Sequence, residues 1–299
     1  LGVATSYTFL AILLFISGIS SAVFHVPAPV LVKNVSGKRI GAGMSFYMVG
    51  GELARTLGPI VILASISYWG LEGSWRLLFF AVAATLFLFF MLRNVDSDVE
   101  IKKKKQEQKN ESIWQYMKSI QMIIIAVSGI TFFRAMMKSA LTAFLPTFIN
   151  SQGESLWFAG ISLTVLQFAG AASVMTAGTV SDKIGRINML KIATIASPVF
   201  MWLFVYLGKA FIFPVLILLG LSIFASTPVL LAFLQEIGKD RPAFINSIYM
   251  TVGFVSGAVA VVLVGALGDV IGLKHTFEIT AYIGIAAIPF VFLLDKKIK

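Results

Sequence analysis

Long apolar stretches, separated by short polar ones, recur along the whole chain. They are rich in Leu, Ile, Phe and Ala and do not alternate between apolar and polar positions, which favours helices over strands. A run of about 18 or more such residues can cross the hydrocarbon of a bilayer as a helix. We therefore predict an all-α polytopic membrane protein with nine transmembrane helices. The predicted spans are residues 7–32, 41–67, 75–93, 118–149, 156–178, 187–208, 211–234, 242–267 and 275–294.

Basic residues gather on one predicted side of the membrane. Of the 24 Lys and Arg residues, 18 fall on the side that holds the C-terminus, three on the other side and three inside spans. We call the first the basic side and the second the opposite side. This bias predicts that the basic side is cytoplasmic, with the C-terminus inside and Leu1 outside, in a cell inner membrane. The net charge of +10 therefore reflects topology, and we expect no nucleic-acid partner.

The composition argues against an enzyme embedded in the membrane. The chain has no cysteine, which excludes disulfides and thiolate metal sites. Its two histidines, His25 and His275, are predicted on opposite faces of the bilayer. No cluster of metal ligands or nucleophiles emerges from the sequence, so we predict no catalytic residue, no metal site and no cofactor.

The chain resembles itself at an offset of 202 residues, which equals six predicted spans. Both copies therefore cross the membrane in the same direction, as expected of two six-helix halves. We predict the last three helices of an N-terminal half in residues 1–93, a cytoplasmic linker in 94–113 and a C-terminal six-helix half in 114–299. On this interpretation about three of an original twelve helices are missing at the front. The matched residues are Gly18, Ser20, Arg39, Ser45, Tyr47, Met48 and Gly51, which fall on Gly220, Ser222, Arg241, Ser247, Tyr249, Met250 and Gly253.

A polar segment, GTVSDKIGRINML, occupies residues 178–190 between two spans. It resembles the signature loop of the major facilitator superfamily, G-x-L-x-D-K/R-x-G-R-K/R-x-x-L, from which Ile187 departs. The resemblance implies that the segment helps to close the cytoplasmic side during alternating access. On physical grounds a carboxylate here can interact with the positive N-terminus of a helix, and glycines permit close approach and a tight turn. The predicted gate residues are Gly178, Asp182, Lys183, Gly185 and Arg186.

A narrower resemblance covers residues 18–59. The stretches GISSAVFHVPAPV and MSFYMVGGELARTLGP are similar to the fosmidomycin resistance family of efflux proteins, in which a Phe-His-Pro span end precedes a helix with Gly-Gly and Gly-Pro. An extra Val26 and the charges of Glu52 and Arg55 depart from that family. Glycine and proline are also predicted to let this helix bend and approach its neighbours. The residues concerned are Gly51, Gly58 and Pro59.

Glu52 and Arg55 lie inside a predicted span at i, i+3 spacing, so they can share one helical face. One interpretation is a self-satisfied ion pair that locks helix packing. The other is a proton-binding carboxylate, Glu52, whose titration is coupled to substrate. The repeat places Phe254 and Gly257 at the equivalent positions, so the architecture does not require both charges.

Arg134 and Lys138 lie at i, i+4 near the centre of another span. Like charges this close need an anion, and the surplus of cations inside spans suggests an anionic substrate, or an anionic group on a larger one. Alternatively Lys138 extends its amine toward the interface, or the missing helices supply the balancing acids. His25, near the end of the first span, is either a helix-end hydrogen bonder or a proton relay.

Together these features predict a secondary active transporter of the major facilitator type, most similar to the fosmidomycin resistance family. We expect proton-coupled efflux of a small anionic or amphiphilic compound by alternating access. The alternatives are a proton symporter that imports an organic anion and a membrane scaffold or sensor that does not transport. The expected partners are a small-molecule substrate, protons and the lipid bilayer, and the expected state is a monomer.

Overall fold

The computed structural model describes residues 6–93, 113–238 and 241–298, except for the side chains of residues 55–56, 58–60, 63, 92 and 297–298. The predicted linker 94–113 lies outside these ranges apart from Ile113. Within them the chain is built from helices and turns, with no strand. The elements are α1 (Tyr7–His25), α2 (Ala28–Ser36), α3 (Ile40–Gly73), η1 (Ser74–Arg76), α4 (Leu77–Leu92), α6 (Ile113–Ser139), η3 (Ala140–Phe144), α7 (Leu145–Ser151), α8 (Leu156–Ile184), α9 (Arg186–Tyr206), η4 (Lys209–Phe211), α10 (Ile212–Ile237), α11 (Pro242–Ile271), α12 (Leu273–Ile285) and α13 (Ile288–Ile298).

The all-α polytopic architecture is confirmed, but eight segments of the described chain, rather than the nine predicted, are long and apolar enough to cross a membrane, and the predicted span 41–67 is not one of them. The predicted span 41–67 lies inside α3, whose 34 residues would extend about 51 Å. The predicted span 118–149 combines α6, the π-helical turn η3 and α7. The predicted loop after residue 178 is much shorter than expected, because α8 continues to Ile184 and α9 begins at Arg186.

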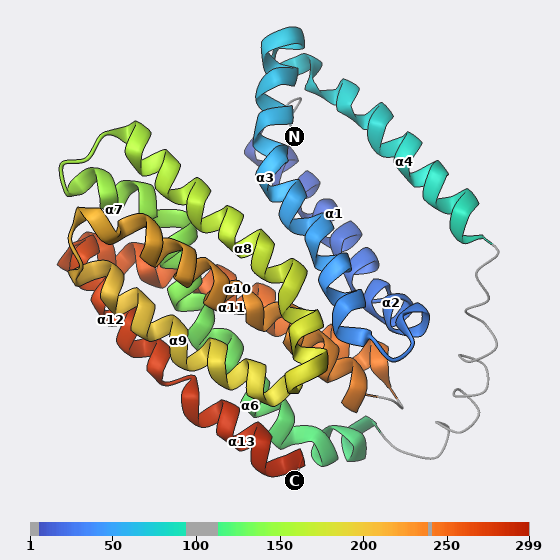
Figure 1. Cartoon of the computed structure of the whole chain (residues 1–299). Helices are drawn as coiled ribbons and strands as arrows, with labels where there is room; N and C mark the ends of the chain where they lie inside the picture. Colours follow the sequence, from blue (N-terminus) through green and yellow to red (C-terminus); the bar gives the residue numbers. More distant parts are fainter. Residues whose placement is uncertain (1–5, 94–112, 239–240, 299) are drawn as a thin grey trace.

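Figure 1 shows α6–α13 gathered into one bundle, with α1–α3 along one flank and α4 standing away from both. Within the bundle α10 is buried along most of its length and packs against α8 and α9. Helix α3 makes its main contact with the bundle through α8, and α2 touches α10 and α11. The flank and the bundle therefore meet along a limited set of helix contacts.

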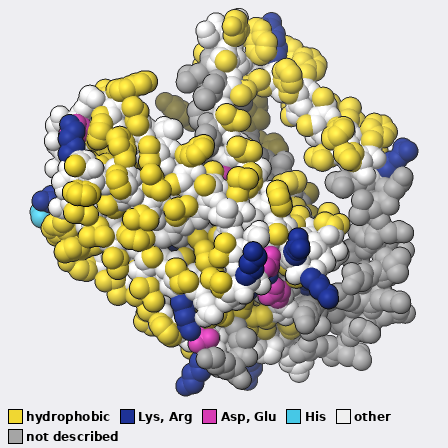
Figure 2. Space-filling view, in the orientation of Figure 1, with side chains coloured by type: hydrophobic (Ala, Val, Ile, Leu, Met, Phe, Trp, Pro, Cys, Tyr) yellow, Lys and Arg dark blue, Asp and Glu magenta, His cyan; other side chains and the backbone are white. Residues whose placement is uncertain are grey.

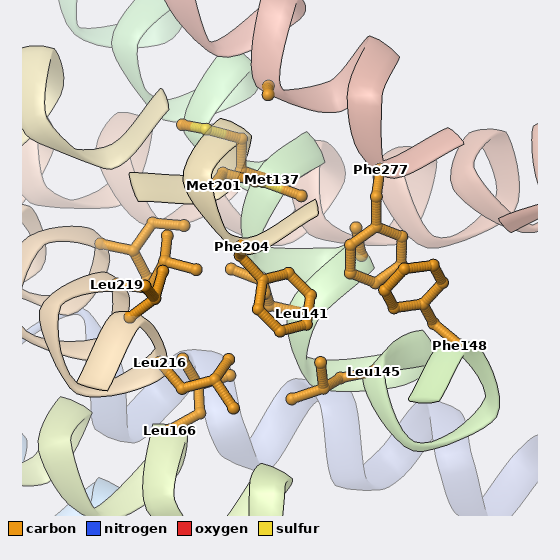
Figure 3. Close-up of a cluster of buried hydrophobic side chains, with 14 of the residues drawn as sticks. Met137, Leu141, Leu145, Phe148, Leu166, Met201, Phe204, Leu216, Leu219 and Phe277 are labelled. Carbon is orange, nitrogen blue, oxygen red and sulfur yellow. The ribbon is translucent and has the colours of Figure 1, made fainter. Parts of the chain in front are cut away.

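The interior of the bundle is a cluster of aliphatic, aromatic and methionine side chains (Figure 3). Phe148 of α7 stacks on Phe277 of α12, with ring centroids 4.5 Å apart and planes inclined by 19°. Phe204 of α9 contacts both rings edge-on or at a tilt. This packing fixes α7 at the opposite side of the bundle although the π-helical turn separates α7 from α6.

The outer surface is apolar, as a lipid-facing surface must be. Hydrophobic side chains cover most of the face seen in Figure 2, and most of its Lys, Arg, Asp and Glu side chains lie toward the lower end. Large exposed side chains include Phe15 on α1, Phe80 on α4, Phe168 on α8 and Val262 on α11. The molecule is accordingly a multi-pass membrane protein.

Helix boundaries repeat at the offset found in the sequence. A shift of 202 residues carries the start of α3 to residue 242, where α11 starts. The same shift carries residue 7, the start of the span Tyr7–Ser36, to residue 209, the start of the span Lys209–Ile237. The kink in α3 is at Gly70, with φ +72° and ψ 170°.

Candidate functional site

A cavity of about 410 Å³ lies between the flank and the bundle. Its charged and titratable lining comes from His25 at the end of α1, Glu52 on α3, and Arg134 and Lys138 on α6. Hydroxyl groups come from α6, η3, α10 and α11, and an apolar wall comes from α11. The hydroxyl-bearing residues are Thr131, Ser139, Thr142, Thr227 and Tyr249, and the apolar wall includes Met250, Phe254 and Val261.

The guanidinium of Arg134 has neutral neighbours. Its Nη1 donates to the hydroxyl of Thr227 at 2.6 Å and, more weakly, to the carbonyl of Ile223 at 3.5 Å. The phenol of Tyr249 lies beside it. In the part of the chain that the structure describes, the buried Nε has no hydrogen-bond partner and no carboxylate forms an ion pair with Arg134. Among the described residues, the direct partners of this positive charge are therefore neutral dipoles.

Lys138 follows Arg134 by one helical turn and lines the same cavity. Its Nζ lies 4.5 Å from the centroid of the Phe224 ring, a cation–π contact. The π-helical turn begins two residues later, and the hydroxyl of Thr142 donates to the carbonyl of Lys138 at 2.8 Å. Such wide turns are frequent at functional sites.

The flank contributes the acid and the imidazole to the cavity lining. Glu52 is only 7% exposed. The Nδ1 of His25 lies 2.9 Å from the hydroxyl of Tyr47, and its ring packs edge-on against Phe254 at 6.2 Å. The side chain of Arg55 lies outside the described residues, so the hypothesis of an ion pair between Glu52 and Arg55 stays a prediction.

The repeat relates two polar pairs on the two sides of the cavity. The offset of 202 residues carries His25 to Thr227 and Tyr47 to Tyr249. The first pair is hydrogen-bonded on the flank, and the second pair surrounds Arg134 in the bundle. The hydroxyls of this second pair were not among the predicted site residues, although the repeat already matched the two tyrosines.

On the basic side the ends of α3 and α8 are joined by a carboxylate and a helix N-terminus. Asp182 accepts backbone N–H groups of Gly41 at 3.1 Å and Ala42 at 3.0 Å, the first turn of α3. Within the bundle Arg186 donates to Asp182 at 2.5 Å and to Glu236 at 2.7 Å. Negative charge at the positive end of a helix is stabilising, so this pairing holds the flank against the bundle.

Two glycines make this contact possible. A Cβ at Gly178 would collide with the carbonyl of Gly41 and the hydroxyl of Ser45, and a Cβ at Gly41 would collide with the carbonyl of Gly178. The N–H of Gly178 donates to Ser45 Oγ at 3.0 Å. Gly185 has φ +93° and ends α8, a conformation that favours glycine.

The remaining predicted residues do not take part in this contact. Lys183 is exposed. At Gly51, which was predicted to allow close helix packing, a Cβ would meet no described atom within 4 Å. In this conformation close approach is therefore provided by Gly41 and Gly178 instead. Gly58 and Pro59 are not among the residues whose side chains the structure describes, so their predicted roles stay predictions.

The flank and the bundle, which together line the cavity, contact each other on the basic side. Helices α3 and α8 touch where Gly41 meets Gly178, and Figure 1 shows the two helices diverging toward their other ends. A second contact on the basic side joins Asn246 of α11 to the carbonyls of His25 and Val26. Sequence reasoning missed Asn246 and Glu236; a polar residue within or at the end of an apolar span was the available signal.

Comparisons with known proteins agree with this architecture. Residues 1–261 match the family model of the Major Facilitator Superfamily. The chain is 22% identical over 289 residues to the fosmidomycin resistance protein of Escherichia coli (strain K12), covering 94% of this chain and 70% of that protein. It is 24% identical over 305 residues to the uncharacterized MFS-type transporter YfnC of Bacillus subtilis (strain 168), covering 100% of this chain and 75% of that protein.

The fold is similar to that of FucP. The crystal structure of this transporter in the outward conformation gives a TM-score of 0.75 at 15% identity, covering 96% of this chain and 76% of that chain. A structure of the Escherichia coli fucose:proton symporter FucP gives the same TM-score and identity, with 77% of that chain covered. Since the family model matches 261 of the 299 residues, the chain belongs to the major facilitator superfamily, whose members transport small molecules across membranes.

Proposed function

We propose that the chain is a proton-coupled transporter that exports a small organic anion, or an amphiphile with an anionic group, by alternating access. The observation that carries this proposal is Arg134, a guanidinium that faces the cavity and is stabilised only by neutral groups among the described residues. A cation in such a place is costly unless an anion joins it. A bound carboxylate, sulfonate or phosphonate group would supply that anion.

The rest of the cavity suits the rest of such a molecule. Lys138 lies one turn from Arg134, and the α11 wall offers Phe254 and Val261 for an apolar portion. The volume of about 410 Å³ is within the range of small-molecule sites. The fosmidomycin resistance protein is a relative, so fosmidomycin is the first compound to test.

Proton coupling is assigned to the flank. Glu52 is a buried carboxylate that the flank contributes to the cavity lining, and His25 also comes from the flank. When Glu52 is ionised it adds negative charge to a cavity that also has to hold the anionic substrate. Protonation of Glu52 therefore favours anion binding, and anion binding favours protonation, because such linkage is reciprocal. This linkage by itself favours movement of proton and anion together. Export by antiport requires in addition that the carrier crosses with anion bound while Glu52 is deprotonated, and returns empty while Glu52 is protonated.

A second candidate is proton-coupled uptake of an organic anion. The likeness to a fucose:proton symporter supports it, as does the linkage between protonation of Glu52 and anion binding. In either case we propose that the basic side is cytoplasmic, that residues 1–93 belong to an N-terminal half and residues 114–299 form the C-terminal half, and that the protein acts as a monomer in the inner membrane.

The test uses the purified chain in proteoliposomes loaded with a pH-sensitive dye. Fosmidomycin and a series of carboxylates, sulfonates and phosphonates with apolar tails are added with and without an imposed pH gradient. Arg134→Gln is expected to abolish anion movement. Glu52→Gln is expected to keep exchange of anion for anion and to lose accumulation driven by the gradient.

Matched controls separate these roles from general damage. Arg76→Gln and Glu154→Gln make the same chemical changes near the opposite side, away from the cavity lining, and should leave both activities intact. Protons moving against the anion indicate export by antiport, and protons moving with it indicate symport. Unchanged anion movement in Arg134→Gln would refute the proposed binding site, and gradient-driven accumulation by Glu52→Gln would refute the proposed coupling.

A further inference from the structure

The junction between α1 and α2 has two carbonyl groups without helical donors. In a regular helix the carbonyl of His25 would accept the N–H of residue 29, and the carbonyl of Val26 would accept that of residue 30. Residue 29 is proline, which has no N–H. The N–H of Val30 donates to the carbonyl of Pro27 instead, at 3.0 Å.

The backbone at this junction remains close to helical. Val26 has φ −77° and ψ −51°, and Pro27 has φ −80° and ψ −29°. The backbone conformation therefore stays close to that of a helix across the junction. What the junction lacks is hydrogen-bond donors for the two carbonyl groups. Buried carbonyls without a donor are costly and are almost always paired in folded proteins.

Asn246 of α11 supplies both donors. Its Nδ2 donates to the carbonyl of His25 at 2.9 Å and to that of Val26 at 2.8 Å, and the side chain is fully buried. Two carbonyl acceptors require the amide nitrogen, which fixes the orientation of the side chain. An aspartate of the same shape would instead face both carbonyls with acceptor oxygens.

The internal repeat offers a natural comparison for this arrangement. At the offset of 202 residues, Asn246 corresponds to Met44 and Pro29 corresponds to Leu231. Leu231 lies inside the continuous helix α10 and has the N–H that proline lacks. Met44 is fully buried in the same apolar cluster as Leu231. The carbonyl of Thr227, which is equivalent to that of His25, therefore has a helical donor available in Leu231, and no amide stands at the position of Met44. Pro228 removes the helical donor of a different carbonyl in α10, that of Phe224.

The contact lies where the cavity is closed. His25 belongs to the cavity lining, and its backbone carbonyl is the group that Asn246 holds. Helix α11 belongs to the bundle and the junction belongs to the flank, so the two hydrogen bonds cross the boundary that must open for the cavity to face the basic side. They act beside the contact of Asp182 with α3, through different helices.

We propose that Asn246 is a positioning residue of the transport cycle. By holding the proline-interrupted junction of α1 and α2 it stabilises the conformation that is closed toward the basic side, and it keeps His25 at the base of the cavity. Pro29 leaves the His25 carbonyl without a helical donor, and the Val30 N–H, which donates to Pro27, leaves the Val26 carbonyl free for Asn246. This inference rests on the alternating access of the proposed function, and is independent of the substrate and of proton coupling.

The experiment uses the absence of native cysteine. Gly253→Cys places a single thiol in the cavity lining, at a position where a Cβ meets no described atom within 4 Å. A membrane-impermeant maleimide is applied from the basic side or from the opposite side of vesicles, with no substrate and no pH gradient. The labelling rate from the basic side is proportional to the population that is open on that side while this population is minor.

In this background Asn246→Leu is expected to raise the labelling rate from the basic side about tenfold, since two buried hydrogen bonds are lost. Asn246→Asp should raise it at least as much, and Met44→Leu at the repeat-equivalent position should leave it unchanged. Pro29→Ala restores an N–H for the His25 carbonyl, so it should raise the rate by a smaller factor and reduce the effect of Asn246→Leu.

These outcomes separate a positioning role from simple loss of stability. A destabilised protein would accumulate less, but its labelling would not move from one side to the other. Equal labelling of Asn246→Leu and the parent from both sides would overturn the proposal, as would full additivity with Pro29→Ala. If Asn246→Leu does not accumulate, Pro29→Ala alone decides, and an unchanged rate in that variant overturns the proposal. Failure of the anion-transport test leaves this result unaffected.

Discussion

Replacing Asp182 by Asn tests what closes the cavity on the basic side. The carboxylate accepts two backbone N–H groups from the first turn of α3, at 3.1 and 3.0 Å, and its side chain is 15% exposed. Its ion pair with Arg186 lies within the bundle, so it is expected to persist in both conformations. Only the contact with α3 therefore depends on which side is open.

The magnitude follows from what asparagine can replace. Its single amide oxygen can accept one of the two N–H groups, and its NH₂ group would face the other as a donor. One charge-assisted hydrogen bond is then lost, worth about 1.5–3 kcal/mol. Much of the attraction to the α3 N-terminus is lost as well, worth about 0.3–1 kcal/mol. Together these losses should destabilise the conformation closed on the basic side by about 2–4 kcal/mol. The ratio of the closed to the open population should therefore fall at least about tenfold.

The assay is the same labelling of a cysteine at position 253 from the two sides. Asp182→Asn should raise the labelling rate from the basic side by at least about tenfold, until the open population becomes the major one. Lys183→Gln is the control, because this exposed neighbour forms no hydrogen bond or ion pair with α3 in the described structure. Normal accumulation of Asp182→Asn with unchanged labelling from both sides would show that the carboxylate does not hold the closed conformation.

Two further predictions concern packing. Gly178→Ala should also open the basic side, because the added methyl group collides with the Gly41 carbonyl at a cost of about 1–3 kcal/mol. In the labelling assay the control Gly51→Ala, which has open space around it, should behave like the parent. Equal labelling rates for the two variants would contradict the close-contact argument. Phe148→Ala should lower the free energy of unfolding by about 3–5 kcal/mol, since it removes a buried ring stacked on Phe277. Thermal unfolding in detergent, followed by Trp fluorescence, measures this loss against Phe168→Ala, an exposed position where little change is expected.

The helices were predictable because a bilayer leaves few alternatives for long apolar runs. The repeat was also predictable, because matched residues recur at one offset. The structure agrees, since the starts of α3 and α11 differ by the same offset. The end of α8 was not predictable from polarity. Asp182 and Lys183 read as a loop, but they form its last turn because the chain leaves the helix only at Gly185.

The partners of the predicted site residues were not predictable from the sequence. Arg134 and Thr227 are 93 residues apart, and only the packing of α6 beside α10 within the bundle brings them together. The same holds for Arg186 and Glu236. Local periodicity gives the face of a helix on which a residue lies, but it does not say which helix that face meets.

The wide turn at Ala140–Phe144 has a mechanical consequence. It stores one surplus residue between the part of α6 that carries Lys138 and the part of α7 that carries Phe148, and each residue of a helix turns the chain by about 100°. Pro146, in the first turn of α7, has no N–H to donate to a carbonyl of the wide turn. Because Ser139 and Thr142 line the cavity and Phe148 stacks on Phe277, the same short segment joins the substrate cavity to the packing at the opposite side of the bundle.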